Sequence, residues 1–474
     1  MSDLAALLPL LRQSAAPAAV DAIEKLLAEG SDAALCRVNV LDFARRAGVS
    51  DDDAIGAFLH AARLGIFEMQ WNVLCPGCGA VLDSNATLKS VQSIEYHCQL
   101  CNTGYEPSLD EMVDVTFTVD PRIRRIAAHD PDSLPPVEYY KQLFWGSWAD
   151  LPDNIGETLD RIELDALELA PGEKATMSLQ LPDRFCIVFE PITHTAQFID
   201  VKGEPTKERR TMSLVFNRLA ASHTMVEMPP GPLRLSFENM TDRRLLPGVW
   251  VADDELHHLL ERRKQFLTAK RLLTNQTFRD LYRTDALESD QRLKITSLTF
   301  LFTDLKGSTA LYDRVGDLKA YDLVREHFDL LNKIVAAEEG AVVKTIGDAV
   351  MATFETSDRA VSAALKMRDA IARVGHGDTN EDRGRGEDLL LKIGIHEGPC
   401  LAVMLNDRQD YFGQTVNIAA RVQGLADSRA ILATGAVVEK EVTAKLLREN
   451  GVKPIAQRQA LRGVTSELTL YELP

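Results

Sequence analysis

The chain lacks three things: a long apolar run, an excess of positive charge, and enough cysteine for a disulfide framework. No apolar run reaches the ~18 residues of a membrane span. The opening residues, MSDLAALLPLLRQ, contain no basic stretch of the kind that begins a secretory signal. Asp and Glu (70) outnumber Lys and Arg (53), and the net charge of −17 repels a phosphate backbone. We therefore expect a cytoplasmic protein that binds no nucleic acid and does not span a membrane.

The seven cysteines are an odd number, which argues against a secreted disulfide scaffold, but four of them form two close pairs. These are Cys75-Pro-Gly-Cys78 and Cys98-Gln-Leu-Cys101, with 19 residues between the pairs. This spacing is typical of a Zn²⁺ ion held by four thiolates. A full set of four protein ligands leaves no position for water, so we expect one structural Zn²⁺ per chain. A redox C-x-x-C pair or chance cysteines are the alternatives.

The 474 residues are enough for about three domains, and the pattern changes several times along them. Residues 1–70 carry apolar residues at helical spacing. Within them, LDFARRAGVSDDDAIGAFLHAARLGIF resembles a helix-turn-helix or winged-helix unit, with Gly48 in the turn and Ser50 as N-cap. The second helix would begin with residues 51–53, all Asp, which suit a helix N-terminus but not DNA. We therefore predict a winged-helix-like packing module.

Four further segments complete the predicted α+β multidomain organisation. Residues 71–110 form the zinc ribbon, and residues 111–255 read as short strands of a β-rich, sandwich-like domain without a catalytic constellation. Residues 256–288 contain no Gly or Pro, so we expect a helical connector of one or two helices over 256–292. From 293 to 474 strands and helices alternate.

Three motifs in residues 293–474 carry the candidate chemistry. In LTFLFTDLKGST an apolar strand ends in Asp304, and Gly307, Ser308 and Thr309 open a helix whose free N–H groups can face phosphate oxygens. A carboxylate beside such a helix start suits a metal–phosphate complex. A capped helix start without a ligand has the same sequence.

The second motif, AVVKTIGDAVMATF, predicts a hairpin with Asp348 near its tip, where it could join Asp304 in holding Mg²⁺ or Mn²⁺. The third, DYFGQTVNIAARVQG, places Asn417 and Arg421 on one face of a helix because they are four residues apart. A turn aspartate and a surface Asn/Arg pair are the alternatives.

Together these motifs resemble the catalytic domain of the class III nucleotide cyclases, with LKIGIHEGP between the second and third, in the family order. The resemblance covers about residues 293–474 and implies a ferredoxin-like fold. It further implies that Asp304, Asp348 and the backbone carbonyl of Leu305 hold two Mg²⁺ or Mn²⁺ ions per active site.

The resemblance also assigns the substrate-binding residues. Lys344 and Asp410 correspond to the pair that selects adenine, where guanylate cyclases have glutamate and cysteine. Asn417 corresponds to the ribose-positioning asparagine and Arg421 to the arginine that stabilises the transition state. Arg462, in Leu-Arg-Gly, replaces the family's phosphate-binding lysine.

The implied function is an adenylate cyclase that converts ATP to 3′,5′-cyclic AMP and pyrophosphate. The family forms head-to-tail dimers with shared sites, so the complete set in this chain implies a homodimer. The alternatives are a cyclase that accepts GTP, CTP or UTP, and a non-catalytic nucleotide-sensing regulator. The N-terminal half resembles an uncharacterised domain found upstream of bacterial cyclase domains, and we expect it to regulate the enzyme through an unknown ligand or protein.

Overall fold

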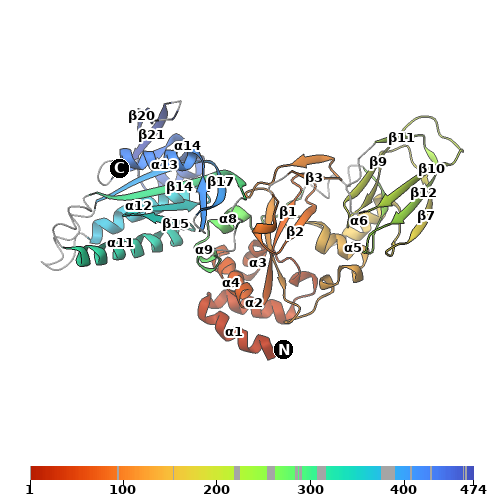
Figure 1. Ribbon diagram of the computed structural model, residues 1–474, viewed down its shortest axis with the longest axis horizontal. Coiled ribbons are helices and arrows are strands. Elements are labelled where there is room, and N and C mark those ends of the chain that lie inside the picture. The colour runs from red at the N-terminus through yellow and green to blue at the C-terminus, as the bar shows by residue number, and fades with distance from the viewer. Residues whose placement is uncertain are drawn as a thin grey trace. The chain divides into compact units, whose positions relative to one another are not determined.

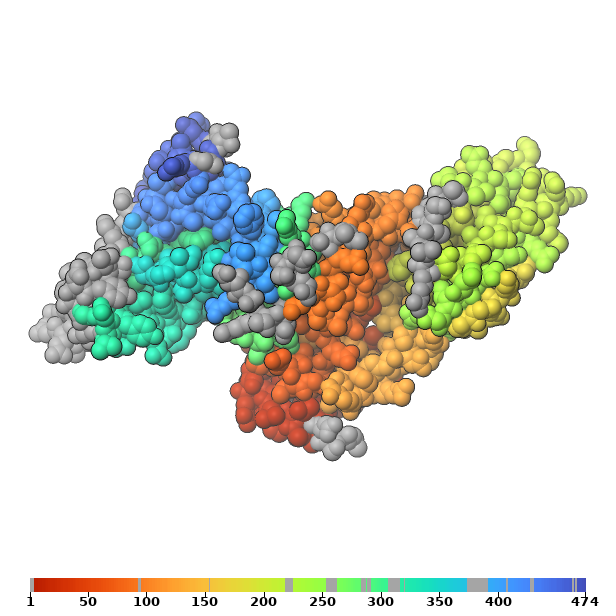
Figure 2. Space-filling view, in the orientation of Figure 1, coloured from red at the N-terminus to blue at the C-terminus, as the bar shows by residue number. Residues whose placement is uncertain are grey.

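The computed structural model describes residues 2–474 except 93–94, 153, 218–224, 253–261, 283–286, 288–290, 307–315, 375–389, 406–407, 427–429, 463 and 465–466. The chain divides into two compact units. The N-terminal unit is Met1–Pro107 with Glu111–Leu267, and the C-terminal unit is Ser108–Asp110 with Thr268–Pro474. They are red to light green and green to blue, respectively, in Figures 1 and 2. Among the described helices, none combines the length and apolarity needed to cross a lipid bilayer.

Helices begin the N-terminal unit, as predicted: α1 (Ser2–Ser14), α2 (Pro17–Glu29), α3 (Val40–Ala47) and α4 (Asp51–Arg63). Gly48 ends α3 with a left-handed φ of 68°, a conformation that costs glycine little. The hydroxyl of Ser50 accepts a hydrogen bond from the N–H of Asp53 at 3.1 Å and so caps α4. The predicted turn and cap are thus confirmed, while the winged-helix assignment stays a prediction.

Two small sheets follow the helices. The first has the order β2-β1-β5, from β1 (Phe67–Leu74), β2 (Val81–Asn85) and β5 (Val113–Val119). The second is the hairpin of β3 (Tyr96–Cys98) and β4 (Thr103–Tyr105). The first cysteine pair lies between β1 and β2, and the second lies between the end of β3 and the start of β4. Both pairs are therefore at turns.

The rest of the N-terminal unit is a two-layer β structure, joined to the first part through α5 (Pro136–Tyr139) and α6 (Ile155–Ile162). One layer has the order β10-β12-β7, from β7 (Lys174–Leu181), β10 (Arg210–Phe216) and β12 (Gly231–Asn239). The other has the order β11-β9-β8-β13-β6, from β6 (Glu163–Ala166), β8 (Cys186–Glu190), β9 (Thr195–Val201), β11 (Val226–Met228) and β13 (Gly248–Val251). Leu233, Leu235 and Phe237 of β12 are buried in the core shared by both layers.

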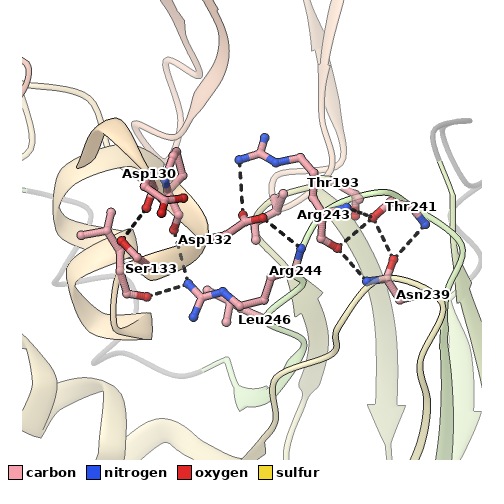
Figure 3. A network of polar contacts seen from close by, with 12 residues as sticks. Asp130, Asp132, Ser133, Thr193, Asn239, Thr241, Arg243, Arg244 and Leu246 are labelled. Atoms are coloured by element: carbon pink, nitrogen blue, oxygen red, sulfur yellow. Dashed lines mark hydrogen bonds and ion pairs between the residues drawn. The ribbon is translucent and has the colours of Figure 1, made fainter. Parts of the chain in front are cut away.

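A polar network around Arg244 fastens this β structure to residues 130–134 (Figure 3). The Arg244 guanidinium donates to the backbone carbonyls of Leu134 at 2.6 Å and Pro131 at 3.4 Å. The carboxylate of Glu190, fully buried, accepts from the N–H of Leu246 at 3.0 Å. Burial raises the pKa of Glu190, and its hydrogen bonds with Leu246, Thr193 and Ile192 oppose that effect.

The C-terminal unit is built on one large antiparallel-rich sheet with the order β15-β16-β14-β17-β19-β21-β20, and β18 pairs with β17. Its strands are β14 (Leu293–Lys306), β15 (Ala341–Ile346), β16 (Ala349–Phe354), β17 (Leu390–Leu405), β18 (Arg408–Phe412), β19 (Ile431–Thr434), β20 (Ile455–Gln459) and β21 (Leu468–Leu473). With α11 (Asp317–Ala337) after β14 and α12 (Ser357–Val374) after β16, the first four strands follow the βαββαβ order of a ferredoxin-like fold. The predicted topology of this unit is therefore present.

The two faces of the sheet carry different helices. One face packs against α11, α12, α14 (Gly435–Val438) and α15 (Glu441–Glu449). The other face packs against α13 (Gln414–Leu425), through Ile418 and Val422. Because side chains alternate along a strand, Leu301 and Leu305 of β14 lie in the first core and Asp304 is directed to the face of α13.

The described part of the predicted connector holds two short helices, α8 (Ala269–Leu273) and α9 (Gln276–Leu281). Thr268 caps α8 by accepting from the N–H of Arg271 at 3.1 Å. Asn275 caps α9 by accepting from the N–H of Phe278 at 3.0 Å. Both helices belong to the C-terminal unit, whereas residues 262–267 belong to the N-terminal unit. The described connector therefore holds two separate helices rather than one, because Asn275 begins a second helix after α8 has ended.

Candidate active site and cysteine cluster

The two predicted metal-binding aspartates lie close enough to influence each other. Asp304 is near the end of β14, where its backbone is opposite Lys392 of β17. Asp348 is in the two-residue turn of the β15–β16 hairpin, after Gly347 with a φ of 64°, so its predicted place at the tip is confirmed. Burial raises the pKa of the half-buried Asp304, and the charge of Asp348 raises it further. Adjacent carboxylates that repel each other are a donor set that suits a divalent cation.

Leu305 follows Asp304 on β14, and its side chain is buried in the core beneath α11 and α12. This packing fixes the strand that carries two of the predicted metal ligands, the carboxylate of Asp304 and the backbone carbonyl of Leu305. The predicted phosphate-binding residues Gly307, Ser308 and Thr309 lie outside the described residues.

Lys344 of β15 and Asp410 of β18 form an ion pair between the Lys344 ammonium and the Oδ2 atom of Asp410. They are 66 positions apart in the sequence. The Asp410 side chain is 8% exposed and that of Lys344 39%, so the carboxylate is fixed while the ammonium reaches solvent. The Oδ1 atom of Asp410 accepts from the N–H of Tyr411 at 2.8 Å.

Asn417 and Arg421 are both exposed on α13, next to the buried face of Ile418 and Val422. The predicted shared face is therefore present. The Arg421 guanidinium donates to the backbone carbonyl of Arg462, and Arg462 is also exposed. The structure thus joins the side chain of Arg421 to the backbone of Arg462.

Two contacts at this site had no signal in the motifs. Gln423, two residues after Arg421, lies near the Asp304 carboxylate, and its side chain lowers the pKa of that group. The charge of Lys392 lowers the same pKa. The helix of Asn417 and Arg421 thus lies beside the strand of the first aspartate.

The four paired cysteines converge in the N-terminal unit. Their sulfur atoms all lie within 4.8 Å of one another, and the Cys75–Cys101 and Cys78–Cys98 pairs are each 3.6 Å apart. Four sulfurs at ~2.3 Å from a tetrahedral Zn²⁺ would be ~3.8 Å apart, so the cluster fits this ion. All four are free thiols rather than disulfides. Hydrogen bonds from the other cysteines, the largest contribution being that of Cys101, lower the pKa of Cys75. The same contact raises the pKa of Cys101.

Comparison with known proteins agrees with this geometry. Residues 291–456 match the family described as the adenylate and guanylate cyclase catalytic domain. The C-terminal unit is thus a class III cyclase catalytic domain. Residues 1–280, more than half of the chain, match a family of unknown function, DUF5939. The protein belongs to that family, with a cyclase domain after it.

Several relatives in this comparison are named as adenylate cyclases. Adenylate cyclase 2 of Rhizobium meliloti is 30% identical over 180 residues, which are 35% of this chain and 49% of that protein. An adenylate cyclase of Anabaena cylindrica is 29% identical over 150 residues, 30% of each chain. The chain thus spans half or less of the length of these relatives.

Solved structures of both cyclase types are also similar. One, of adenylate cyclases from Trypanosoma brucei in their monomeric state, is 25% identical with a TM-score of 0.32, over 38% of this chain and 89% of that one. Another, the guanylate cyclase domain of a protein from Catenaria anguillulae in complex with GTP, is 22% identical with a TM-score of 0.31, over 38% and 97%.

Proposed function

We propose that the protein is an adenylate cyclase that converts ATP to 3′,5′-cyclic AMP and pyrophosphate. The observation that carries this proposal is the ion pair between Lys344 and Asp410, in a domain that matches the cyclase family. A lysine is a donor only, so Lys344 can donate to N1 of adenine, whereas guanine carries a proton there. Asp410 can accept from the 6-amino group of adenine. Its fixed carboxylate also restrains the Lys344 ammonium.

The acidic residues have a separate task, to hold divalent cations against the triphosphate. Asp304, Asp348 and the carbonyl of Leu305 are the proposed ligands, and the mutual repulsion of the two carboxylates supports this role. When bound, two Mg²⁺ or Mn²⁺ ions lower the pKa of the ribose 3′-hydroxyl and neutralise charge on the leaving pyrophosphate. The nearby Gln423 side chain favours the ionised form of Asp304, which is the form that binds a cation.

The exposed residues of α13 act on the sugar and the phosphates. Asn417 would fix the ribose so that its 3′-oxygen is aligned with the α-phosphorus. Arg421 would donate to the charge that develops on the α-phosphate, an interaction worth ~10²–10³ in rate. Arg462, beside Arg421, adds a second cation for the triphosphate.

We further propose a head-to-tail homodimer with two equivalent shared sites. Lys344 and Asp348 are four residues apart and flank one hairpin turn, yet they serve the base and the phosphates, at opposite ends of ATP. A shared site resolves this if the base-binding residues come from one subunit and the aspartates from its twin. Ile346 (53% exposed) and Phe412 (64% exposed), beside Lys344 and Asp410, are apolar surfaces that a partner would cover.

The N-terminal half is proposed to be regulatory, with a structural Zn²⁺ at the cysteine cluster. The fit of the four sulfur atoms to tetrahedral spacing supports the metal. The direction of regulation follows from comparing the full chain with residues 268–474, which keep the two short helices of the C-terminal unit. The comparison is informative provided that the shorter protein is shown by circular dichroism to be folded.

The test of the proposed function is an assay of the full chain with ATP, GTP, CTP and UTP, each with Mg²⁺ or Mn²⁺. Cyclic nucleotide and pyrophosphate are both measured. We expect equal amounts of cyclic AMP and pyrophosphate from ATP and much less product from the other nucleotides. Equal turnover of GTP would favour the relaxed cyclase, and nucleotide binding without turnover would favour the non-catalytic regulator.

A further inference from the structure

The short helix α9 contacts the backbone next to both members of the Lys344–Asp410 pair. The Nη2 atom of Arg279 donates to the carbonyl of Gln409 at 2.9 Å and to that of Val343 at 3.4 Å. These are the residues immediately before Asp410 and Lys344. One guanidinium nitrogen therefore bridges the two strands at the positions that precede the proposed base-reading residues.

Among the residues that the structure describes, no backbone pairing joins these two strands. In the sheet β15 pairs with β16, and β18 pairs with β17, so no ladder of hydrogen bonds sets the distance between β15 and β18. The register of β15 also shifts between Val342 and Lys344, a bulge that redirects the side chains beside it. The side chain of Gln276 accepts from the N–H of Val342 at 2.8 Å. Side chains of α9 thus hold the backbone at Val342 and Val343, where the register shifts.

The Arg279 side chain is itself held in place. Its guanidinium lies over the ring of Tyr411, 6.0 Å from the centroid. The Tyr411 ring is buried, and its hydroxyl donates to the carbonyl of Leu273 at 3.3 Å. A planar guanidinium with five donors can stack on a ring and bridge two carbonyls together, which a lysine cannot do in the same geometry.

We infer that Arg279 is a positioning residue that sets the nucleotide selectivity of the site, by holding Lys344 and Asp410 at the spacing that fits the adenine edge. The inference rests on the proposed function, because it assumes that this pair reads the base. The hydrogen bonds of Arg279 are to the backbone before the pair, not to the Asp304 or Asp348 carboxylates. Its loss therefore affects the base-reading pair first and leaves the metal-binding residues in place.

The test uses the full chain and the variants Arg279→Ala and Arg279→Lys, with steady-state kinetics for ATP and GTP. For Arg279→Ala we expect the KM for ATP to rise and the ratio of kcat/KM for ATP over GTP to fall, each about tenfold. Arg279→Lys keeps a positive charge and one donor group. Its KM for ATP and its ATP-over-GTP ratio should therefore lie between those of the wild type and those of Arg279→Ala. The matched control is Arg292→Ala, which removes an exposed arginine between the same helices and β14 and should leave both quantities unchanged.

A merely structural role would lower turnover of both nucleotides equally and leave their ratio intact, and that result would overturn the inference. Should Arg279→Ala fail to fold, as judged by circular dichroism, Arg279→Gln makes the same comparison with one amide donor retained. A wild-type protein that does not prefer ATP would contradict the proposed base choice, and the inference with it. A wild type that prefers ATP, with an unchanged ratio in folded Arg279→Ala, would contradict the inference alone.

Discussion

Gly394 of β17 lies directly against the backbone of Gln423 on α13. A Cβ atom at Gly394 would be 2.1 Å from the Gln423 nitrogen and 2.4 Å from its Cα, closer than atoms can approach. The helix of Asn417 and Arg421 therefore rests at this depth because position 394 has no side chain. We predict that Gly394→Ala displaces α13 and lowers kcat for ATP by about 10²-fold or more.

Gly424, one residue after Gln423, provides a matched control for this prediction. It is exposed near the end of α13, and a Cβ atom there would meet nothing within 4 Å. Gly424→Ala should keep wild-type kinetics and gain up to about 1 kcal/mol of stability, because alanine favours a helix. Wild-type activity in Gly394→Ala would show that the depth of α13 does not matter for turnover.

The shared active site predicts complementation between two inactive variants. Asp304→Ala removes a proposed metal ligand and Arg421→Ala a transition-state contact, so each homodimer should lose ~10²–10³ in rate. After subunit exchange in an equal mixture, half of the dimers are mixed and each has one intact site, which restores about one quarter of wild-type activity. Cyclic AMP formation measures this recovery.

Subunit exchange is verified separately, with one variant carrying an affinity tag that the other lacks. A mixture of Arg421→Ala with Asn417→Ala is the control. In the head-to-tail arrangement these two residues of one site come from the same subunit. Each of the two sites in a mixed dimer therefore lacks one of them, and no activity should return. Both pairs of variants would stay inactive after proven exchange if each site were formed by a single chain.

The local features of the site could be predicted from the sequence, because each depends on neighbouring residues. The hairpin with Asp348 at its tip needs only two β-prone runs around Gly347. The shared face of Asn417 and Arg421 needs only helical periodicity. The cap at Ser50 is likewise a local hydrogen bond.

Contacts between distant segments could not be derived in this way. The Lys344–Asp410 contact was implied only by the resemblance, because nothing in either motif encodes a partner 66 residues away. The proximity of Gln423 to Asp304 had no signal in the sequence, since a glutamine on a helix is ordinary. The starts of α8 and α9 did have a signal in the sequence, the capping residues Thr268 and Asn275. A search for Gly and Pro alone overlooks this signal.

The cysteine cluster predicts a zinc-dependent N-terminal unit. Cys98→Ser should lower the zinc content, measured by atomic emission, from about one ion per chain to near zero. Because a structural zinc site contributes folding free energy, the variant should also lose more than about 4 kcal/mol of stability. Cys186→Ser changes a buried thiol outside the cluster and should keep its zinc. Unchanged zinc content in Cys98→Ser would contradict the four-thiolate site.

A buried carboxylate in the N-terminal unit predicts a dependence of stability on pH. Asp114 of β5 is fully buried, and its Oδ2 atom accepts from the N–H of Ser147 at 3.2 Å. Its Oδ1 atom has no hydrogen-bond partner in the part of the chain that the structure describes. Burial raises the pKa of Asp114 to about 7, although the bonds with Ser147 and the charge of Arg37 oppose this.

A raised carboxyl pKa means that the folded state binds the proton more tightly than the unfolded state. Stability is therefore lost as pH rises from about 4 to about 7, and the full cost is present above pH 7. Asp114→Asn removes this cost, so its advantage over the wild type should grow by about 2 kcal/mol between pH 5 and pH 8, measured by urea unfolding. Asp183→Asn, at an exposed position, should show no such trend. Parallel pH profiles of Asp114→Asn and the wild type would mean that Asp114 is ionised in the folded protein at no cost.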